Sequence, residues 1–120
     1  MGDEAIASVA AACQSCKRDS DIGGRLGGEE FVLLLPETDA AQAAILAERI
    51  REKVAGRVLS AHRVQFSLTI SIGIASATAS MSGIEALLHP ADQALYQAKA
   101  EGRNRIVQWS PPLAPKLAAE

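Results

Sequence analysis

The sequence predicts an α+β fold, in which helices cover one or both faces of a mainly antiparallel sheet. Segments with apolar residues at helical spacing alternate with segments typical of strands, in the order helix, hairpin, helix, strand, helix, strand. A Gly-Gly step between two short apolar runs indicates the hairpin. With 120 residues and 48% hydrophobic content, the chain is expected to form one modest domain at 1–109, followed by a Pro-rich tail at 110–120.

The first helix is expected to begin with Asp3 as its N-cap and to run to about Lys17, because apolar residues recur on one helical face. The hairpin follows at about 21–36. Its turn falls on Gly27 and Gly28, since glycine reaches positive φ without strain.

The second helix is expected to start at Thr38 and Asp39, with Gln42 as a capping partner, and to end at Gly56. Next comes the clearest strand signal of the chain, the period-two alternation of apolar and small polar residues at about 64–77.

A short helix is expected from Ser82 to Leu88, with Ser82 and Glu85 as a possible capping box. Pro90 then restarts a helix at its favoured first position, and Gly102 stops it. A last short strand is expected at 105–109.

Two carboxylates, Glu29 and Glu30, follow the two turn glycines directly. Successive strand residues point to opposite faces, so only one of these acids can face a given ligand. Acids beside a bare backbone turn suit a hard divalent cation that carries a phosphate. The alternative is an ordinary exposed hairpin whose glutamates are solvated.

Charge and composition narrow the function. Twelve basic and fourteen acidic residues give a formal charge of −2, which argues against a general nucleic-acid-binding surface. No signal peptide or membrane span is evident, so a cytoplasmic protein is expected.

Cys13 and Cys16 form a C-x-x-C that could indicate redox chemistry or half of a zinc site, but without a second pair we interpret them as small apolar residues. Lys99 and Arg103, four residues apart at a helix end, can converge on one anion.

Five stretches of the chain form a recognisable set. In chain order they are RDSD at 18–21, RLGGEEF at 25–31, LTISIGIA at 68–75, ADQALYQAK at 91–99 and GRNR at 102–105. Together they resemble the GGDEF domain of diguanylate cyclases, in its glutamate variant. The resemblance extends from Asp3 to about Val107. It implies a fold similar to the ferredoxin-like catalytic palm of adenylyl cyclases and polymerases.

The resemblance implies that two GTP molecules are condensed to cyclic di-GMP, with release of pyrophosphate and with Mg²⁺ or Mn²⁺ as cofactor. Each 3′-hydroxyl would attack the α-phosphate of the other nucleotide, and the metal would neutralise charge. The matching positions are Glu29 as metal-binding acid and base, Glu30 as a second metal ligand, Gly27 and Gly28 at the substrate turn, Asp3 on the guanine edge, and Lys99 and Arg103 on the triphosphate.

A second matching set is Arg18, Asp21 and Arg49, which corresponds to the family's product-inhibition site. Arginine suits this role because its planar fork grips phosphate or guanine edges at two points. The alternative is a surface salt bridge between Arg18 and Asp21, which contributes little stability.

The resemblance also implies parts that lie before residue 1 in a complete domain: a central strand and a helix with an Asp metal ligand, a phosphate loop and an Asn that reads guanine. Two functions therefore compete, a partial and inactive cyclase domain or a non-catalytic module that binds cyclic di-GMP. The two-fold symmetry of the product, and strands at 31–35 and 68–74 with no central partner, predict a homodimer or direct pairing of these two strands.

Overall fold

A computed structural model describes residues 2–27, 30–78 and 81–110. Its helices and strands, in chain order, are α1 (Gly2–Cys16), β1 (Ile22–Gly27), β2 (Glu30–Leu34), α2 (Ala40–Ala55), β3 (Leu59–Ala61), β4 (Val64–Phe66), β5 (Ile72–Ile74), α3 (Ile84–Ala100) and β6 (Ile106–Gln108). This confirms the α+β class and the order of the predicted helices and main strands.

The described strands form three two-stranded sheets. β1 and β2 are antiparallel, with Ile22 opposite Leu34 and an irregularity between Arg25 and Gly27. β3 pairs antiparallel with β4, whereas β5 pairs parallel with β6. The expected direct pairing of β2 with β5 is not observed among these residues, since β2 is paired with β1 and β5 with β6.

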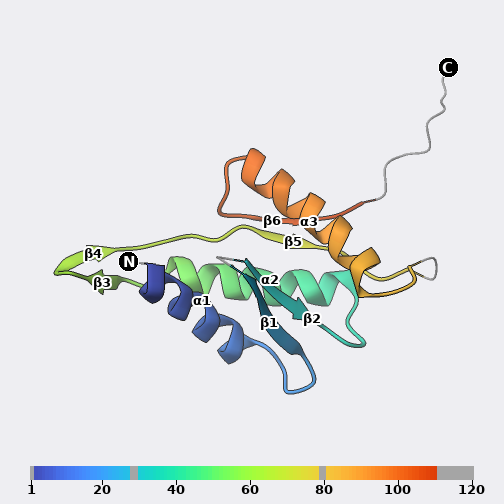
Figure 1. The fold of residues 1–120 in the computed structure, drawn as a ribbon, viewed down its shortest axis with the longest axis horizontal. Coiled ribbons are helices and arrows are strands. Elements are labelled where there is room, and N and C mark those ends of the chain that lie inside the picture. Colours follow the sequence, from blue (N-terminus) through green and yellow to red (C-terminus); the bar gives the residue numbers. More distant parts are fainter. Residues whose placement is uncertain (1, 28–29, 79–80, 111–120) are drawn as a thin grey trace.

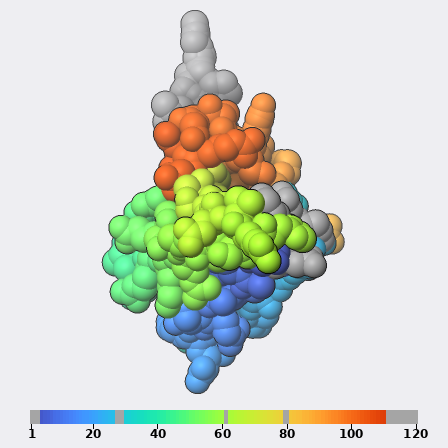
Figure 2. All heavy atoms as spheres, turned by 90° about the vertical axis from the view of Figure 1, so that its left-hand side faces the viewer, coloured from blue at the N-terminus to red at the C-terminus, as the bar shows by residue number. Residues whose placement is uncertain are grey.

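The helices lie in layers around these strands. α1 packs against α2, and the β5–β6 pair contacts α2 as well as α3. Figure 1 shows α3 and β6 on one side of the molecule and α1 on the other, and Figure 2 shows the same separation from the end, with α2, β3 and β4 between them.

A small aliphatic core joins α1 to α2. Ala12, Ile50 and Val54 are buried at its centre, and Leu33 of β2 packs against them together with Val9, Cys13, Cys16, Leu46, Leu68 and Ile70. The apolar faces of the two helices therefore meet as their spacing predicted, and the hairpin is attached to them through one face of β2.

Gly73 of β5 permits the close approach of α3. A Cβ atom at this position would collide with the backbone of α3, at the carbonyl of Ala91 and the amide of Leu95. The helix that carries Lys99 therefore lies directly on the strand, and no larger residue fits there without moving it.

Several boundaries differ from those predicted. α1 already includes Gly2, so Asp3 lies within the first turn and not at the N-cap. The segment 64–77 is not one strand, because β4 turns back on β3 and only Ile72–Ile74 forms the later strand. In the β3–β4 turn, His62 and Arg63 have positive φ. A turn of this kind is usually indicated by glycine or asparagine, and neither residue is present here.

The two helices expected on either side of Pro90 are one helix. α3 runs from Ile84 to Ala100 with Pro90 buried inside it, and its N-cap, Gly83, makes no side-chain cap hydrogen bond, so the Ser82–Glu85 capping box is not formed. Apolar residues continue at helical spacing on both sides of the proline, and packing outweighs the lost hydrogen bond.

The predicted start and end of α2 are confirmed. Asp39 is its N-cap in a capping box with Gln42, and Gly56 is its C-cap. Within the described residues, none of the helices has the length and apolar character needed to cross a membrane. Most of the tail expected at 110–120 lies outside the described residues.

Candidate functional site

The first candidate site, here called the arginine pocket, lies where the end of α1, the end of β2 and one side of α2 meet. Its volume is about 210 Å³. The lining residues are Cys16, Arg18, Asp21, Leu35, Thr38, Gln42, Ile45, Leu46 and Arg49. All three predicted product-inhibition residues therefore line one pocket, although Arg49 comes from a different element than Arg18 and Asp21.

Arg18 and Asp21 form a multiply bonded ion pair. Arg18 Nη2 donates to Asp21 Oδ1 at 2.8 Å, and Nε lies 3.2 and 3.3 Å from the two carboxylate oxygens. The backbone N–H of Arg18 donates to Oδ2 at 2.8 Å. The Asp21 side chain is fully buried, whereas that of Arg18 is 53% exposed, so the pair has a buried base and an accessible cation.

The hydrogen bond from the Arg18 side chain lowers the pKa of Asp21 below its ordinary value, and burial opposes this shift without cancelling it. The same hydrogen bond raises the pKa of Arg18. Both groups are charged at neutral pH, and the buried carboxylate fixes the arginine at the mouth of the pocket. The interaction is thus more than the exposed salt bridge considered as the alternative.

The exposed Arg49 adds a second cation, and no ion pair to it is found in the described part of the chain. With two arginines, one carboxylate and the apolar side chains of Leu35, Ile45 and Leu46, the lining combines net positive charge with an apolar wall. Such a lining suits an anion that carries a flat apolar group, such as a nucleotide.

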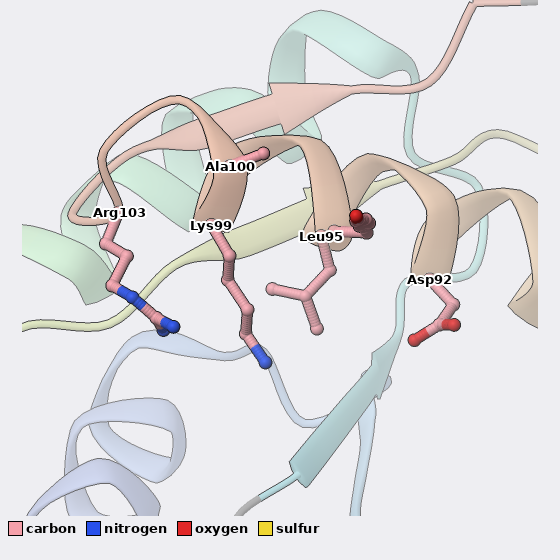
Figure 3. A pocket seen from close by; sticks show the side chains of 6 residues that line it. Asp92, Leu95, Lys99, Ala100 and Arg103 are labelled. Carbon is pink, nitrogen blue, oxygen red and sulfur yellow. The ribbon is translucent and has the colours of Figure 1, made fainter.

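The second candidate site, here called the helix pocket, lies on α3 and the turn after it. Its lining residues are Asp92, Leu95, Tyr96, Lys99, Ala100 and Arg103, around a volume of about 380 Å³. Figure 3 shows Asp92, Leu95 and Lys99 extending from the helix, and Arg103 from the turn after it, to the same side. The two predicted phosphate-binding cations are therefore neighbours on one surface.

A left-handed turn places Arg103. Gly102, Arg103 and Asn104 have φ of 122°, 63° and 49°, and the N–H of Arg103 donates to the carbonyl of Ala98 at 2.9 Å. Arg51 of α2 donates to Asn104 Oδ1 at 2.6 Å. This tether holds the turn against α2 and keeps Arg103 near the end of the helix.

The predicted metal site is described only in part. Glu30 begins β2, opposite Gly27, and is exposed, whereas Gly28 and Glu29 lie outside the described residues. Asp3 lies in α1, but its side chain is also outside the description. Among the residues that are described, no group of three His, Cys, Asp or Glu side chains could hold a metal ion. The described residues therefore do not fit Mg²⁺ or Mn²⁺ by themselves.

Other residues of the two pockets were not singled out from the sequence. Thr38 was noted only at the start of a helix, yet it lies in the arginine pocket beside Arg18. Tyr96 is 66% exposed on the helix pocket, where its helical spacing from Lys99 could have indicated it. The two cysteines are free thiols that pack on the core, as expected of small apolar residues. Burial raises the pKa of the Cys13 thiol.

Comparison with known proteins agrees with this architecture. The family model described as "Diguanylate cyclase, GGDEF domain" matches residues 1–105. The Caulobacter vibrioides response regulator PleD is 44% identical over 109 residues, which is 89% of this chain and 24% of PleD. The chain thus spans about a quarter of the length of this curated relative.

Solved structures match as well. The active GGEEF domain of a Vibrio cholerae diguanylate cyclase is similar with a TM-score of 0.81 and 34% identity, over 92% of this chain and 69% of that one. The GGDEF domain of DgcB from Caulobacter crescentus, in complex with c-di-GMP, has a TM-score of 0.83 and 32% identity, over 88% and 63%. The α+β fold is therefore that of solved GGDEF domains. The chain belongs to the diguanylate cyclase GGDEF family.

Proposed function

We propose that this chain is part of a diguanylate cyclase domain which, as a 120-residue polypeptide, binds cyclic di-GMP at the arginine pocket and does not synthesise it. The observation that carries the binding proposal is the meeting of Arg18, Asp21 and Arg49 in one pocket. The complex of the similar DgcB domain with c-di-GMP supports this choice of ligand.

The chemistry of the pocket suits this ligand. Cyclic di-GMP carries two phosphates and two guanines, and an arginine fork can bind either group at two points. Arg18 is fixed by the buried Asp21, and Arg49 is exposed and unpaired within the described part of the chain. Leu35, Ile45 and Leu46 add apolar surface for a base.

The activity that the family suggests for a complete domain is the condensation of two GTP molecules. In this proposal Lys99 and Arg103 hold the triphosphate tail, because two cations on one surface of α3 can neutralise adjacent phosphates. Glu29 and Glu30 would serve a metal in the complete site, and Asp3 would accept hydrogen bonds from guanine. Catalysis then requires metal ligands besides the described residues, which hold no suitable cluster.

Two domains would face each other across the two-fold axis of the product, as an isologous pair. β2 and β5 each have one strand partner among the described residues, which leaves their other edges for further pairing. We therefore propose a homodimer of this cytoplasmic domain. Light scattering that gives a compact monomer at micromolar concentration, with unfolding independent of concentration, would contradict it.

The binding proposal is tested by calorimetric titration of the 120-residue chain with cyclic di-GMP. Arg49→Ala should weaken binding about 10- to 150-fold, the range expected for a lost hydrogen bond to a charged group. Lys53→Ala is the matched control, because this exposed cation lies one turn further along α2 and outside the pocket. If both variants bind like the parent, or the parent gives no binding heat, the proposal is wrong.

A further inference from the structure

The hydroxyl of Thr38 is not needed to cap α2, although Thr38 lies directly before the N-cap of this helix. The N-terminus of α2 is capped by Asp39, whose carboxylate accepts from the Gln42 N–H at 2.8 Å. The Gln42 side chain in turn accepts from the Asp39 N–H. Since this capping box is complete, the Thr38 side chain is available for another role.

The Thr38 hydroxyl bonds to Arg18, twenty residues earlier in the chain. Arg18 Nη2 donates to Thr38 Oγ1 at 2.6 Å, and the hydroxyl lies 3.0 Å from the carbonyl of Pro36. A guanidinium can only donate, so the hydroxyl must accept from Arg18 and donate its own proton to Pro36. The direction of both hydrogen bonds is thereby fixed.

The loop at the end of β2 is bent so that both oxygens face Arg18. Nη2 also lies 2.9 Å from the Pro36 carbonyl. Between Pro36 and Thr38, Glu37 has a φ of 52°, a left-handed conformation that is uncommon for a residue other than glycine. Such strain persists where the surrounding structure holds it in place, and it is frequent at ligand sites.

Arg18 is therefore held from two sides. Asp21 binds Nε and Nη2 from the buried side, and Thr38 and Pro36 bind Nη2 from the loop. Within the described residues the other terminal nitrogen, Nη1, makes no hydrogen bond, so its two N–H groups are available to a ligand. The exposed guanidinium is thus oriented before any ligand arrives.

We infer that Thr38 is a positioning residue of the arginine pocket, which fixes the rotamer of Arg18 so that Nη1 is presented to a bound phosphate or guanine. This inference rests on the proposed binding of cyclic di-GMP. Its physical basis is preorganisation, because a side chain that is already ordered loses less freedom when the ligand binds.

The test compares three variants of the 120-residue chain by calorimetry with cyclic di-GMP. Thr38→Val keeps the shape but removes the hydroxyl, and it should weaken binding roughly 2- to 12-fold, the cost of ordering one long side chain. Thr38→Ser restores the hydroxyl and should bind within about twofold of the parent. Thr38→Ala replaces the valine variant should that one not unfold cooperatively.

A second measurement separates positioning from general stability. In the parent, the Arg18 Nε–H proton should exchange slowly in NMR spectra without ligand, and it should exchange faster in Thr38→Val but not in Thr38→Ser. Unfolding of each variant in urea shows whether a loss of affinity reflects a loss of fold.

The outcomes distinguish the two proposals. Suppose that the parent binds cyclic di-GMP, that Arg49→Ala weakens this binding, and that Thr38→Val has the same affinity as the parent. The inference about Thr38 is then overturned, while the proposed function stands. Equal weakening in Thr38→Val and Thr38→Ser also overturns it, because the hydroxyl is then not responsible. A parent that binds no cyclic di-GMP overturns both.

Discussion

The two cationic pockets of this chain differ in the number of elements that line them. In the arginine pocket, side chains from α1, from the loops on either side of the hairpin and from α2 surround the space, and the buried Asp21 anchors the exposed Arg18. Among the described residues, those that line the helix pocket all come from α3 and the turn after it. Within this part of the chain, one pocket has several walls, and the other has a single wall that carries two cations.

This contrast supports the proposal that the 120-residue polypeptide binds cyclic di-GMP and does not synthesise it. A ligand held by charge and shape needs walls on several sides, which the arginine pocket supplies. Phosphoryl transfer also needs metal ions and in-line alignment of the reacting groups. The described residues of the helix pocket supply cations for the phosphates and hold no metal cluster.

The largest expected effect is therefore the absence of turnover. Given GTP and magnesium, the 120-residue polypeptide should form no cyclic di-GMP detectable by chromatography. The preparation should nevertheless bind added cyclic di-GMP in calorimetry, which serves as the control for its folding. Product formed at the rate of an ordinary enzyme, about 1 s⁻¹ or more, would show that the helix pocket is complete after all.

The substitution Gly73→Ala should disturb α3, which carries the helix pocket, and leave the arginine pocket intact. The added methyl group meets the backbone of α3 and cannot be accommodated by a rotamer change. We expect a loss of about 1–3 kcal/mol in the free energy of unfolding, as for other overpacked sites. The matched variant is Gly24→Ala, where a Cβ meets nothing within 4 Å.

Because α3 lies away from α1, the remaining folded protein should still bind cyclic di-GMP at the arginine pocket. Urea unfolding followed by far-ultraviolet circular dichroism measures the first effect, and calorimetry below the transition measures the second. Equal stability of Gly73→Ala and the parent would mean that α3 does not lie directly on β5.

The parts of the fold that were predicted correctly are those with local signals. The capping box of α2 lies within four residues, 39–42, and the Gly-Gly step indicated the β1–β2 hairpin. The turn itself was placed on Gly27 and Gly28, whereas Gly27 is the last residue of β1 and Gly28 lies outside the described residues. The β3–β4 hairpin was missed because His62 and Arg63 adopt positive φ without the glycine or asparagine that usually indicates it. α3 passes through Pro90 because its packing on β5 and β6, which no local pattern reports, outweighs one hydrogen bond.

The same division holds for the sites. Lys99 and Arg103 are four residues apart at a helix end, and this spacing indicates the pair. Arg18 and Asp21 follow from the resemblance of residues 18–31 to the GGDEF family. Thr38 contacts Arg18, which lies twenty residues earlier in the chain. Its position before α2 predicts only that it starts a helix, so the sequence does not indicate this contact. Long-range partners of this kind require the folded chain.

Acid should weaken the arginine pocket more than the helix pocket. Because the hydrogen bond from Arg18 lowers the pKa of Asp21 in the folded state, the ionised carboxylate stabilises the fold at pH values above about 4, its unfolded pKa. This contribution is complete at neutral pH and is lost as pH falls below 4 through the lowered pKa.

The measurement is urea unfolding of the parent and of Asp21→Asn between pH 3 and pH 6, in roughly half-unit steps. Glu48, whose pKa is lowered by its hydrogen bond with Arg51, also responds to acid, but it is common to both proteins. The difference in stability between parent and variant should be constant near neutrality and shrink below pH 4. A difference that does not change with pH would mean that Asp21 is not the group that titrates.

The smallest expected effect is that of removing divalent metal. Binding of cyclic di-GMP at the arginine pocket should be unchanged by EDTA or by added magnesium, because Arg18 and Arg49 neutralise the ligand directly and the pocket contains one carboxylate, already paired. Calorimetry at constant ionic strength is the appropriate measurement, since salt alone screens arginine–phosphate attraction. A binding constant that falls more than about threefold with EDTA, and recovers with excess magnesium, would show that a metal bridges ligand and protein. In that case the metal would belong to the arginine pocket, and binding there would not depend on Arg18 and Arg49 alone.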